Sequence, residues 1–309
     1  MTRVLVLGAK GQLGSELCRW LGGAVDLVAA DRQRADLAQF DVLVRLIDEV
    51  RPDVVVNAAA YTAVDRAEQE EAIAFRVNGE APGVIAERCR RLGAALVHFS
   101  TDYVFDGAAA GAYKETDECR PLNAYGRSKR AGELAIAQVG AAHLILRVAW
   151  LYGLEGSNFV KTMLRLAADR PTLSVVADQF GAPTWVRTVA QWLHGQLAPP
   201  GKHAEPRWRS DPGIYHVAPA GRTTWYEVAC TVISLAEKHP IARGSLRCRA
   251  ANIRAIRSTD YPTPALRPAN SQLDSTKACT LLSWSAPEWR DELVAFTRLL
   301  LDAQAGAPN

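Results

Sequence analysis

A glycine-rich turn near the N-terminus constrains the fold of this chain more than any other feature of its sequence. The turn directly follows an apolar run, Val4–Leu7, and it opens a segment with helical periodicity. In such a unit one glycine permits the tight turn, a second lets the backbone approach a pyrophosphate, and a third allows close packing of helix on strand. Amides at the start of the helix also favour an anion. The residues expected to hold a dinucleotide here are Gly8, Gly11, Gln12, Leu13 and Gly14.

The first half of the chain alternates short aliphatic runs with longer helical patterns. This alternation predicts βαβ units and a parallel sheet, and continuously apolar runs fit strands that helices cover on both faces. The predicted strands are Val4–Leu7, Leu27–Ala30, Val54–Asn57, Leu96–Ser100 and Leu144–Arg147. We therefore expect an α/β fold in which residues 1–150 form a Rossmann-type, doubly wound parallel sheet that binds NAD(P).

From about Tyr152 the periodicity weakens, which predicts a smaller α/β C-terminal lobe over residues 151–309. We expect this lobe mainly to bind the substrate, with some segments packing back on the first domain. Its predicted helices are Asn158–Ala168, Thr188–Leu197, Tyr226–Glu237 and Glu288–Leu301. The polar stretch 198–213 is rich in turn residues and is expected to be an exposed loop.

The balance of charges and cysteines argues against several classes of function. The chain has 36 basic and 33 acidic residues, with no block of like charges, so we expect neither nucleic acid nor a membrane as a partner. No stretch approaches the ~20 apolar residues of a membrane-spanning helix. The six cysteines form no Cys-x-x-Cys pair, which disfavours a zinc site or a redox dithiol. These features and the lack of a signal-peptide pattern predict a cytoplasmic protein.

Charged residues after the second predicted strand bear on the choice of cofactor. Asp31 lies where a carboxylate hydrogen-bonds the adenosine ribose hydroxyls and favours NADH. Arg32 beside it would accept the 2′-phosphate of NADPH. We expect NADPH, and NADH stays open. Further residues expected to line the cofactor are Asp36, Leu37, Ala59, Ala60, Tyr61 and Thr62.

Tyr125 and Lys129 are the predicted catalytic pair. Residues four apart at the start of a helix share one face, so the ammonium of Lys129 is placed to act on the phenol of Tyr125. A free phenol has a pKa near 10, and a nearby cation lowers it toward the range useful for proton transfer at neutral pH. The pair stands behind a dinucleotide motif and after a predicted strand, so both residues are expected to lie at the bound cofactor.

Thr101 is the third predicted catalytic residue. It follows the strand Leu96–Ser100, at the edge of the sheet where open α/β folds bind ligands. Its hydroxyl would donate to the substrate carbonyl as negative charge develops there. For Ser100 a structural bond to the backbone is nearly as good an interpretation.

Several longer motifs are similar to those of the dTDP-4-dehydrorhamnose reductase family, a branch of the extended short-chain dehydrogenases. Glycines spaced three apart also suit that superfamily. The resemblance covers nearly the whole chain apart from 198–213 and the C-terminal tail. It is carried by the segments Asn57–Asp65, Ser100–Gly107, Pro121–Lys129, Arg147–Gly153, Asp178–Thr184, Thr224–Glu227 and Tyr261–Ser271.

The resemblance implies reduction of dTDP-4-dehydro-L-rhamnose to dTDP-L-rhamnose by NAD(P)H, with Tyr125 as proton donor. It also implies that Lys129 lowers the pKa of Tyr125 and holds the nicotinamide ribose, and that Thr101 binds the sugar C4 oxygen. Asp102 and Trp150 would contact the sugar, although Trp150 as ordinary core packing is nearly as good an interpretation. The protein is expected to be a monomer or a homodimer.

Some family members hold magnesium between protomers, and Glu16 and Glu292 match two of the ligand positions. Arg187 stands near the third, so a metal site is not expected here. Tyr103 occupies the position where related dehydratases carry an acid, which argues against dehydration. A reductase or epimerase of another nucleotide deoxysugar stays open, as does a non-catalytic regulatory subunit on the same fold.

Overall fold

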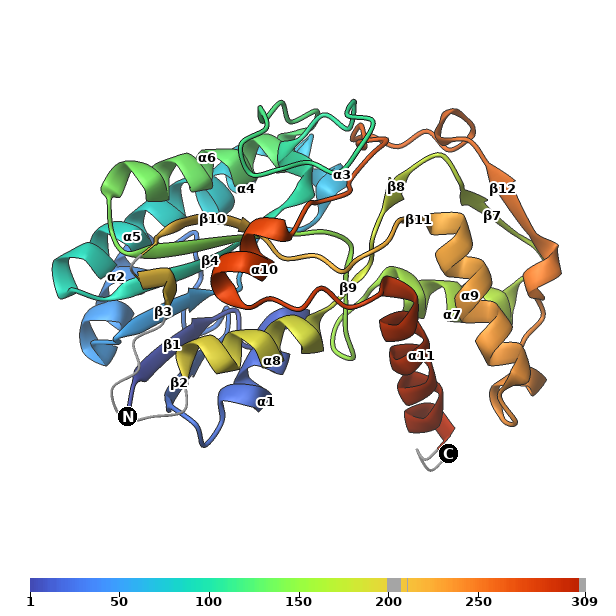
Figure 1. Ribbon diagram of the computed structural model, residues 1–309, viewed down its shortest axis with the longest axis horizontal. Helices are drawn as coiled ribbons and strands as arrows, with labels where there is room; N and C mark the ends of the chain where they lie inside the picture. The colour runs from blue at the N-terminus through green and yellow to red at the C-terminus, as the bar shows by residue number, and fades with distance from the viewer. Residues whose placement is uncertain (199–206, 210, 306–309) are drawn as a thin grey trace.

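The computed structural model, which describes residues 1–198, 207–209 and 211–305, is built around a six-stranded parallel sheet (Figure 1). The strand order is β10-β5-β4-β3-β1-β2. All five strands predicted from the sequence are confirmed, with ends shifted by at most one residue. The strands are β1 (Arg3–Leu7), β2 (Asp26–Ala30), β3 (Val54–Asn57), β4 (Ala95–Thr101), β5 (His143–Val148) and β10 (Gly213–His216).

Alternate side chains of β1 explain why its sequence is continuously apolar. Val4 and Val6 are buried against one helix layer, and Leu5 and Leu7 against the other. The first layer contains α1 (Gln12–Leu21) and α8 (Val186–Leu197), and the second contains α2 (Phe40–Val50), α5 (Ala81–Leu92) and α6 (Ala124–Val139). Burial on both faces removes the polar alternation of a half-exposed strand. The doubly wound α/β fold is therefore confirmed.

Between β3 and α5 the chain forms α3 (Val64–Ala67), α4 (Glu71–Phe75) and a π-helical turn, η1 (Arg76–Glu80). A short 3₁₀ turn, η2 (Asp102–Val104), follows β4. These pieces lie at the carboxyl end of the sheet, where the parallel strands β1, β3 and β4 all end. This edge is where open α/β sheets bind their ligands.

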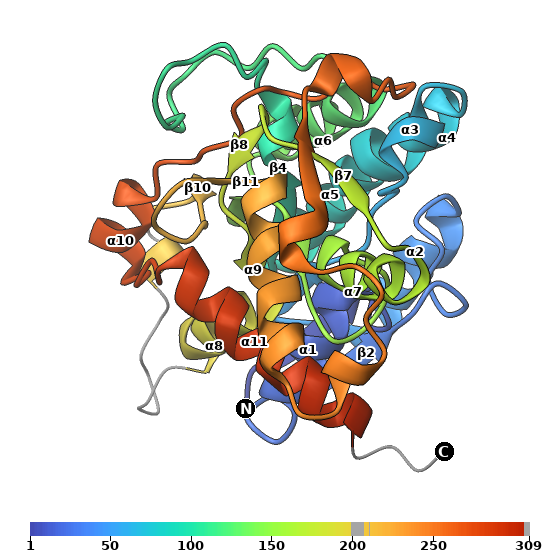
Figure 2. The same cartoon turned by 90° about the vertical axis from the view of Figure 1, so that its right-hand side faces the viewer.

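The second half of the chain builds a smaller lobe beside this edge (Figures 1 and 2). Its main helices are α7 (Phe159–Asp169), α9 (Trp225–Lys238) and α11 (Trp289–Ala305), and α9 packs on both of the others. The predicted helices are confirmed to within four residues at each end. The short strands are β6 (Leu151–Tyr152), β7 (Leu173–Val176), β8 (Phe180–Gly181), β9 (Thr184–Trp185), β11 (Thr223–Thr224) and β12 (Ile253–Ile256). The remaining elements are η3 (Arg207–Arg209), η4 (Ala242–Gly244), η5 (Ala250–Asn252), η6 (Ser258–Asp260) and α10 (Thr276–Leu282).

Three elements from the second half complete the first domain: α8 lies against α1, β10 pairs with β5, and α10 contacts β10 and buries Ala278 and Leu282 in the core shared with β1. The prediction of an exposed loop over 198–213 is wrong at Trp208. This side chain is fully buried in the core that also holds β5 residues, because its large apolar surface outweighs the polarity of its neighbours. Positions 199–206 and 210 lie outside the described residues. Across the described part of the chain, no helix has the length and apolar character needed to span a membrane.

Candidate active site

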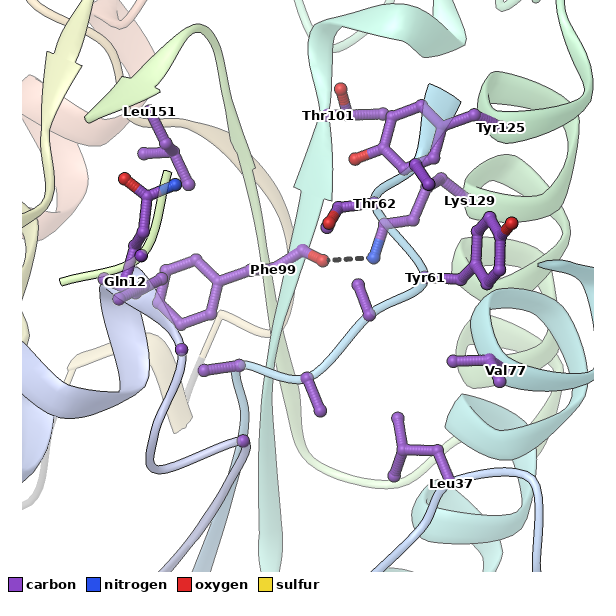
Figure 3. A pocket seen from close by; sticks show the side chains of 18 of the residues that line it. Gln12, Leu37, Tyr61, Thr62, Val77, Phe99, Thr101, Tyr125, Lys129 and Leu151 are labelled. Atoms are coloured by element: carbon purple, nitrogen blue, oxygen red, sulfur yellow. Dashed lines mark hydrogen bonds between the residues drawn. The ribbon is translucent and has the colours of Figure 1, made fainter. Parts of the chain in front are cut away.

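A cleft of about 990 Å³ opens at the carboxyl ends of β1, β3 and β4 (Figure 3). Every site residue predicted from the sequence lines it except Gly14. Its walls come from the glycine turn, the end of β2, the segment after β3, the end of β4 and the start of α6. Lining residues that the sequence did not single out include Lys10, Val77, Phe99, Leu151, Gly156 and Ser157.

The glycine turn joins β1 to α1 with almost no free space. Gly8 has φ 81°, and a Cβ added there would lie 2.7 Å from the backbone nitrogen of Ala59. A Cβ at Gly14 would lie 2.0 Å from the carbonyl oxygen of Gly8. Gly14 therefore serves the packing of α1 on the turn, which explains its absence from the cleft wall. The turn leaves backbone exposed at Gly8 and Gly11, as a pyrophosphate requires.

Asp31 is already engaged within the protein. One carboxylate oxygen accepts hydrogen bonds from the backbone N–H groups of Gln33 and Arg34, at 3.1 and 3.2 Å. The other lies 2.5 Å from the ammonium of Lys10 in the glycine turn. The hydrogen bond to Lys10 is the main reason that the pKa of Asp31 is lowered. A cation therefore stands beside the carboxylate where the cofactor ribose is expected.

Arg32 lies close by and is largely exposed, with its Nε 3.2 Å from Asp36. Exposed ion pairs are weak, so the guanidinium of Arg32 can leave Asp36 and turn toward a ligand. Leu37 is buried beneath this region. Lys10 and Arg32 together give this end of the cleft two cations.

The segment after β3 is held by side chains from η1 and α4. Asn78 accepts a hydrogen bond from the N–H of Tyr61 at 2.9 Å and donates to its carbonyl oxygen at 3.0 Å. The Tyr61 hydroxyl donates to Glu70 at 2.6 Å. These contacts keep the small residues Ala59 and Ala60 in the cleft wall, where a cofactor would lie flat against them.

Tyr125 and Lys129 enter the cleft from the first turns of α6. Asn123 caps this helix by accepting a hydrogen bond from the N–H of Gly126 at 2.8 Å. A Cβ at Gly126 would lie 2.2 Å from the carbonyl oxygen of Tyr103, so the helix approaches η2 closely. Figure 3 shows Tyr125 beside Thr101, with Lys129 reaching past the phenol ring toward β4.

The pKa of Tyr125 in the free protein is not lowered, as the sequence had predicted, but raised. Burial raises the pKa of Tyr125 to about 12, and the hydrogen bond with Thr101 only partly offsets this effect. Lys129 does not lower it, because its Nζ donates to the carbonyl oxygen of Phe99 at 2.6 Å instead of facing the phenol. Lys129 itself is buried, which lowers its pKa to about 8. In the free protein the phenol is therefore fully protonated at neutral pH, as a proton donor must be.

Thr101 and Asp102 form a small polar group at the end of β4. The Thr101 hydroxyl donates to Asp102 at 3.0 Å and accepts a hydrogen bond from the N–H of Tyr103 at 3.2 Å. Asp102 is buried, and desolvation raises its pKa to about 6. One of its carboxylate oxygens has no partner in the described protein. An unpartnered, buried acceptor in a cleft is available to a hydroxyl of a ligand.

Trp150 lines the cleft from the second lobe side. Its backbone has φ 51°, and its ring stacks on Trp225 with centroids 3.7 Å apart. A Cβ at Gly181 would lie 2.7 Å from the Trp150 ring, so Gly181 packs directly against this ring. The tryptophan thus packs against Trp225 and Gly181 and also contributes to the lining of the cleft.

Comparison with known proteins agrees with this geometry. The model of the RmlD substrate binding domain family matches residues 1–301. The chain belongs to this family. It is 44% identical over 289 residues to a dTDP-4-dehydrorhamnose reductase of Burkholderia thailandensis, covering 93% of this chain and 95% of that protein. It is 39% identical to the Escherichia coli enzyme of the same name, over 93% of this chain and 94% of that protein.

The fold is also that of a solved member of the RmlD family. The crystal structure of dTDP-4-dehydrorhamnose reductase from Bacillus anthracis in complex with NADP matches with a TM-score of 0.85 and 32% identity. The match covers 96% of this chain and 99% of that one. The family resemblance predicted from the motifs is confirmed by these relatives, as is the prediction of an NAD(P)H-dependent oxidoreductase.

The residues at the magnesium site that the family resemblance raises do not fit a metal. Arg187 and Arg19 donate to the two carboxylate oxygens of Glu16, at 2.9 and 2.8 Å, and so supply the positive charge that a metal would bring. Glu292 instead accepts a hydrogen bond from Thr188. Among the described residues, no three His, Cys, Asp or Glu side chains are grouped as metal ligands.

Proposed function

We propose that this chain reduces dTDP-4-dehydro-L-rhamnose to dTDP-L-rhamnose, with NADPH as hydride donor and Tyr125 as proton donor. The observation that carries the proposal is the position of a protonated phenol beside Thr101 in a cleft whose other end is a glycine turn. The names of the relatives in the RmlD family supply the substrate.

Cofactor binding is assigned to the glycine turn and to the cations near Asp31. The backbone of Gly8, Gly11, Gln12 and Leu13 faces the cleft beside the N-terminus of α1, which suits a pyrophosphate. Lys10 and Arg32 would hold a 2′-phosphate. Lys129 would reach the nicotinamide ribose by leaving the Phe99 carbonyl. When bound, the reduced nicotinamide supplies the hydride.

The protein residues have separate roles around the substrate ketone. Thr101 donates a hydrogen bond to the C4 oxygen as charge develops there. Tyr125 transfers its hydroxyl proton to the same oxygen, which completes the alcohol. Asp102 accepts from a sugar hydroxyl with its unpartnered oxygen, and Trp150 bounds the sugar at the end of the first domain, next to the second lobe.

We propose that the nucleotide sugar lies between residues 1–150 and the second lobe, because Trp150 and Leu151 enter the cleft where the lobes meet. A cytoplasmic location follows from the need for a reduced nicotinamide pool. We further propose that the protein acts as a monomer or a homodimer.

The decisive experiment supplies dTDP-4-dehydro-L-rhamnose with NADPH or NADH and follows the absorbance of the reduced nicotinamide. We expect oxidation of the cofactor that depends on the sugar, with dTDP-L-rhamnose as the product. An epimerase would change the sugar without net oxidation of NADPH. A regulatory subunit would bind NADPH without turnover. Either result would refute the proposal.

A further inference from the structure

A buried row of polar side chains lies directly behind the catalytic pair. Neighbouring strands place Asn57 on β3 opposite His98 on β4, and the amide nitrogen of Asn57 lies 3.2 Å from Nδ1 of His98. On the other side, Nε2 of His98 lies 3.3 Å from the Nζ of Lys129. All three side chains are at most 2% exposed. The polar atoms of this row are therefore shielded from bulk water in this arrangement.

The orientation of Asn57 fixes the proton on His98. The N–H of Ala59 donates to the side-chain oxygen of Asn57 at 3.2 Å, so the NH₂ group must face His98. Nδ1 of His98 is then an acceptor. A neutral imidazole has one donor and one acceptor, which puts its proton on Nε2. Burial holds the pKa of His98 well below its ordinary value, so the ring is neutral.

This tautomer points an N–H at Lys129. An ammonium has only donors, so it cannot make a hydrogen bond to that group. The neutral amine can, because its lone pair accepts from His98 Nε2 while one of its own N–H groups donates to the Phe99 carbonyl. The contacts of His98 therefore stabilise the amine form of Lys129 over the ammonium form.

We propose that His98 is a positioning residue that sets the charge state of Lys129 through a tautomer fixed by Asn57. The proposal deepens the proposed function, because it concerns the lysine assigned there to the nicotinamide ribose. In the free enzyme His98 holds Lys129 away from full protonation. Movement of Lys129 to the bound cofactor breaks the contact and restores the ammonium beside Tyr125.

The other charged groups around Lys129 either favour its ammonium form or are neutralised by ion pairs. Glu133, one turn further along α6, favours the ammonium. Its own charge is balanced by Arg147 on β5 and Arg130 on α6, both at 2.7 Å. From η1 the neutral side chain of Asn78 faces α6 and bonds to Ser128 at 3.1 Å. His98 is thus the group from β4 that opposes protonation.

The first test reads the tautomer without using activity. Ring ¹⁵N chemical shifts of labelled protein distinguish a protonated from an unprotonated imidazole nitrogen, and the His98→Gln variant assigns the signal. We expect the Nε2–H tautomer in the parent protein. Asn57→Asp should reverse it to Nδ1–H, because a carboxylate accepts where the amide donated. A parent protein with Nδ1–H, or a variant with an unchanged tautomer, would overturn the proposal.

The second test uses the pH profile of kcat/KM. In His98→Gln the amide is free to turn its oxygen toward Lys129 and accept from the ammonium. We expect the midpoint of the alkaline limb to rise by about one pH unit. One hydrogen bond to a charged group contributes roughly the free energy that corresponds to such a pKa shift. Asn57→Asp should move the midpoint in the same direction. A loss of activity with the limb unmoved in both variants would mean a purely structural role.

The two tests separate failure of this inference from failure of the proposed function. If the parent protein does not reduce the sugar, the ¹⁵N measurement still decides whether the tautomer is as stated. If the parent protein is active and its tautomer is Nδ1–H, only the inference fails. Thermal unfolding of both variants shows whether they fold before either measurement is read.

Discussion

The ammonium of Lys10 lies 2.5 Å from a carboxylate oxygen of Asp31, which ties the glycine turn to the end of β2. A carboxylate at the end of β2 ordinarily favours NADH by accepting from the ribose hydroxyls. Here the same oxygen is shared with a cation that would bind a 2′-phosphate. We therefore expect one cleft to accept both cofactors, with Lys10 turning toward the 2′-phosphate when NADPH is bound.

Replacing Lys10 with methionine should weaken NADPH binding by about tenfold, because one charge-assisted contact to phosphate is lost. NADH binding should change by no more than a few fold. Titration of each reduced cofactor by fluorescence gives both dissociation constants. Lys114→Met, which removes an exposed lysine outside the cleft lining, is the matched control. An equal loss for both cofactors in Lys10→Met would remove Lys10 from the phosphate site.

The strand pattern was predictable because burial on both faces leaves an unbroken apolar signal, as at Val54–Asn57. Motif spacing also found Tyr125 and Lys129, since a helix fixes which residues share a face. Lys10 could not be found in that way. It lies between the glycines of the turn, where their spacing specifies no residue type, and its significance comes from the approach of Asp31 in space.

Sequence reasoning failed where tertiary contacts decide the outcome. Trp208 is surrounded in sequence by polar residues, and only the packing of its side chain against the sheet shows that it is core. Helical spacing likewise suggested that Lys129 acts on the Tyr125 phenol. Lys129 is held instead by the carbonyl of Phe99 on β4. Because this acceptor is a backbone group, no pattern of side chains in the sequence could indicate it.

Tyr125→Phe should reduce kcat by at least about 100-fold, because in the proposed mechanism the phenol supplies the proton that completes the alcohol. NADPH affinity should stay within a few fold, since the hydroxyl is needed only in the transition state. Steady-state assays and cofactor titration measure the two effects separately. Tyr261→Phe changes an exposed tyrosine that does not line the cleft and serves as control. Activity near the parent level in Tyr125→Phe would contradict the assigned role.

Gly14→Ala should destabilise the protein by at least about 1–3 kcal/mol, because the new methyl group would lie 2.0 Å from the carbonyl oxygen of Gly8. Since the strain falls on the glycine turn, cofactor affinity should fall as well. Urea unfolding with and without NADPH measures both effects. Gly111→Ala is the control, because a methyl group there meets nothing within 4 Å. Similar stability of the two variants would contradict the packing role of Gly14.

Asp102 should make stability depend on pH in a direction that is unusual for a carboxylate. Burial raises its pKa from 3.8 in the unfolded chain to about 6 in the folded protein. The stabilisation from its protonated form is fully present below about pH 4 and is lost as the pH rises through 6. Above that range the buried charge costs on the order of 2–3 kcal/mol.

Asp102→Asn removes this charge while keeping an oxygen that accepts from Thr101. The variant should therefore gain stability relative to the parent protein between pH 4.5 and pH 8, and urea unfolding at the two pH values measures the gain. Asp41→Asn, at an exposed position of α2, controls for the loss of one negative charge. A difference between variant and parent that is the same at both pH values would show that Asp102 is not buried as a charged group. Because its unpartnered oxygen is also assigned to the sugar, the variant should raise KM for the nucleotide sugar while it stabilises the free enzyme.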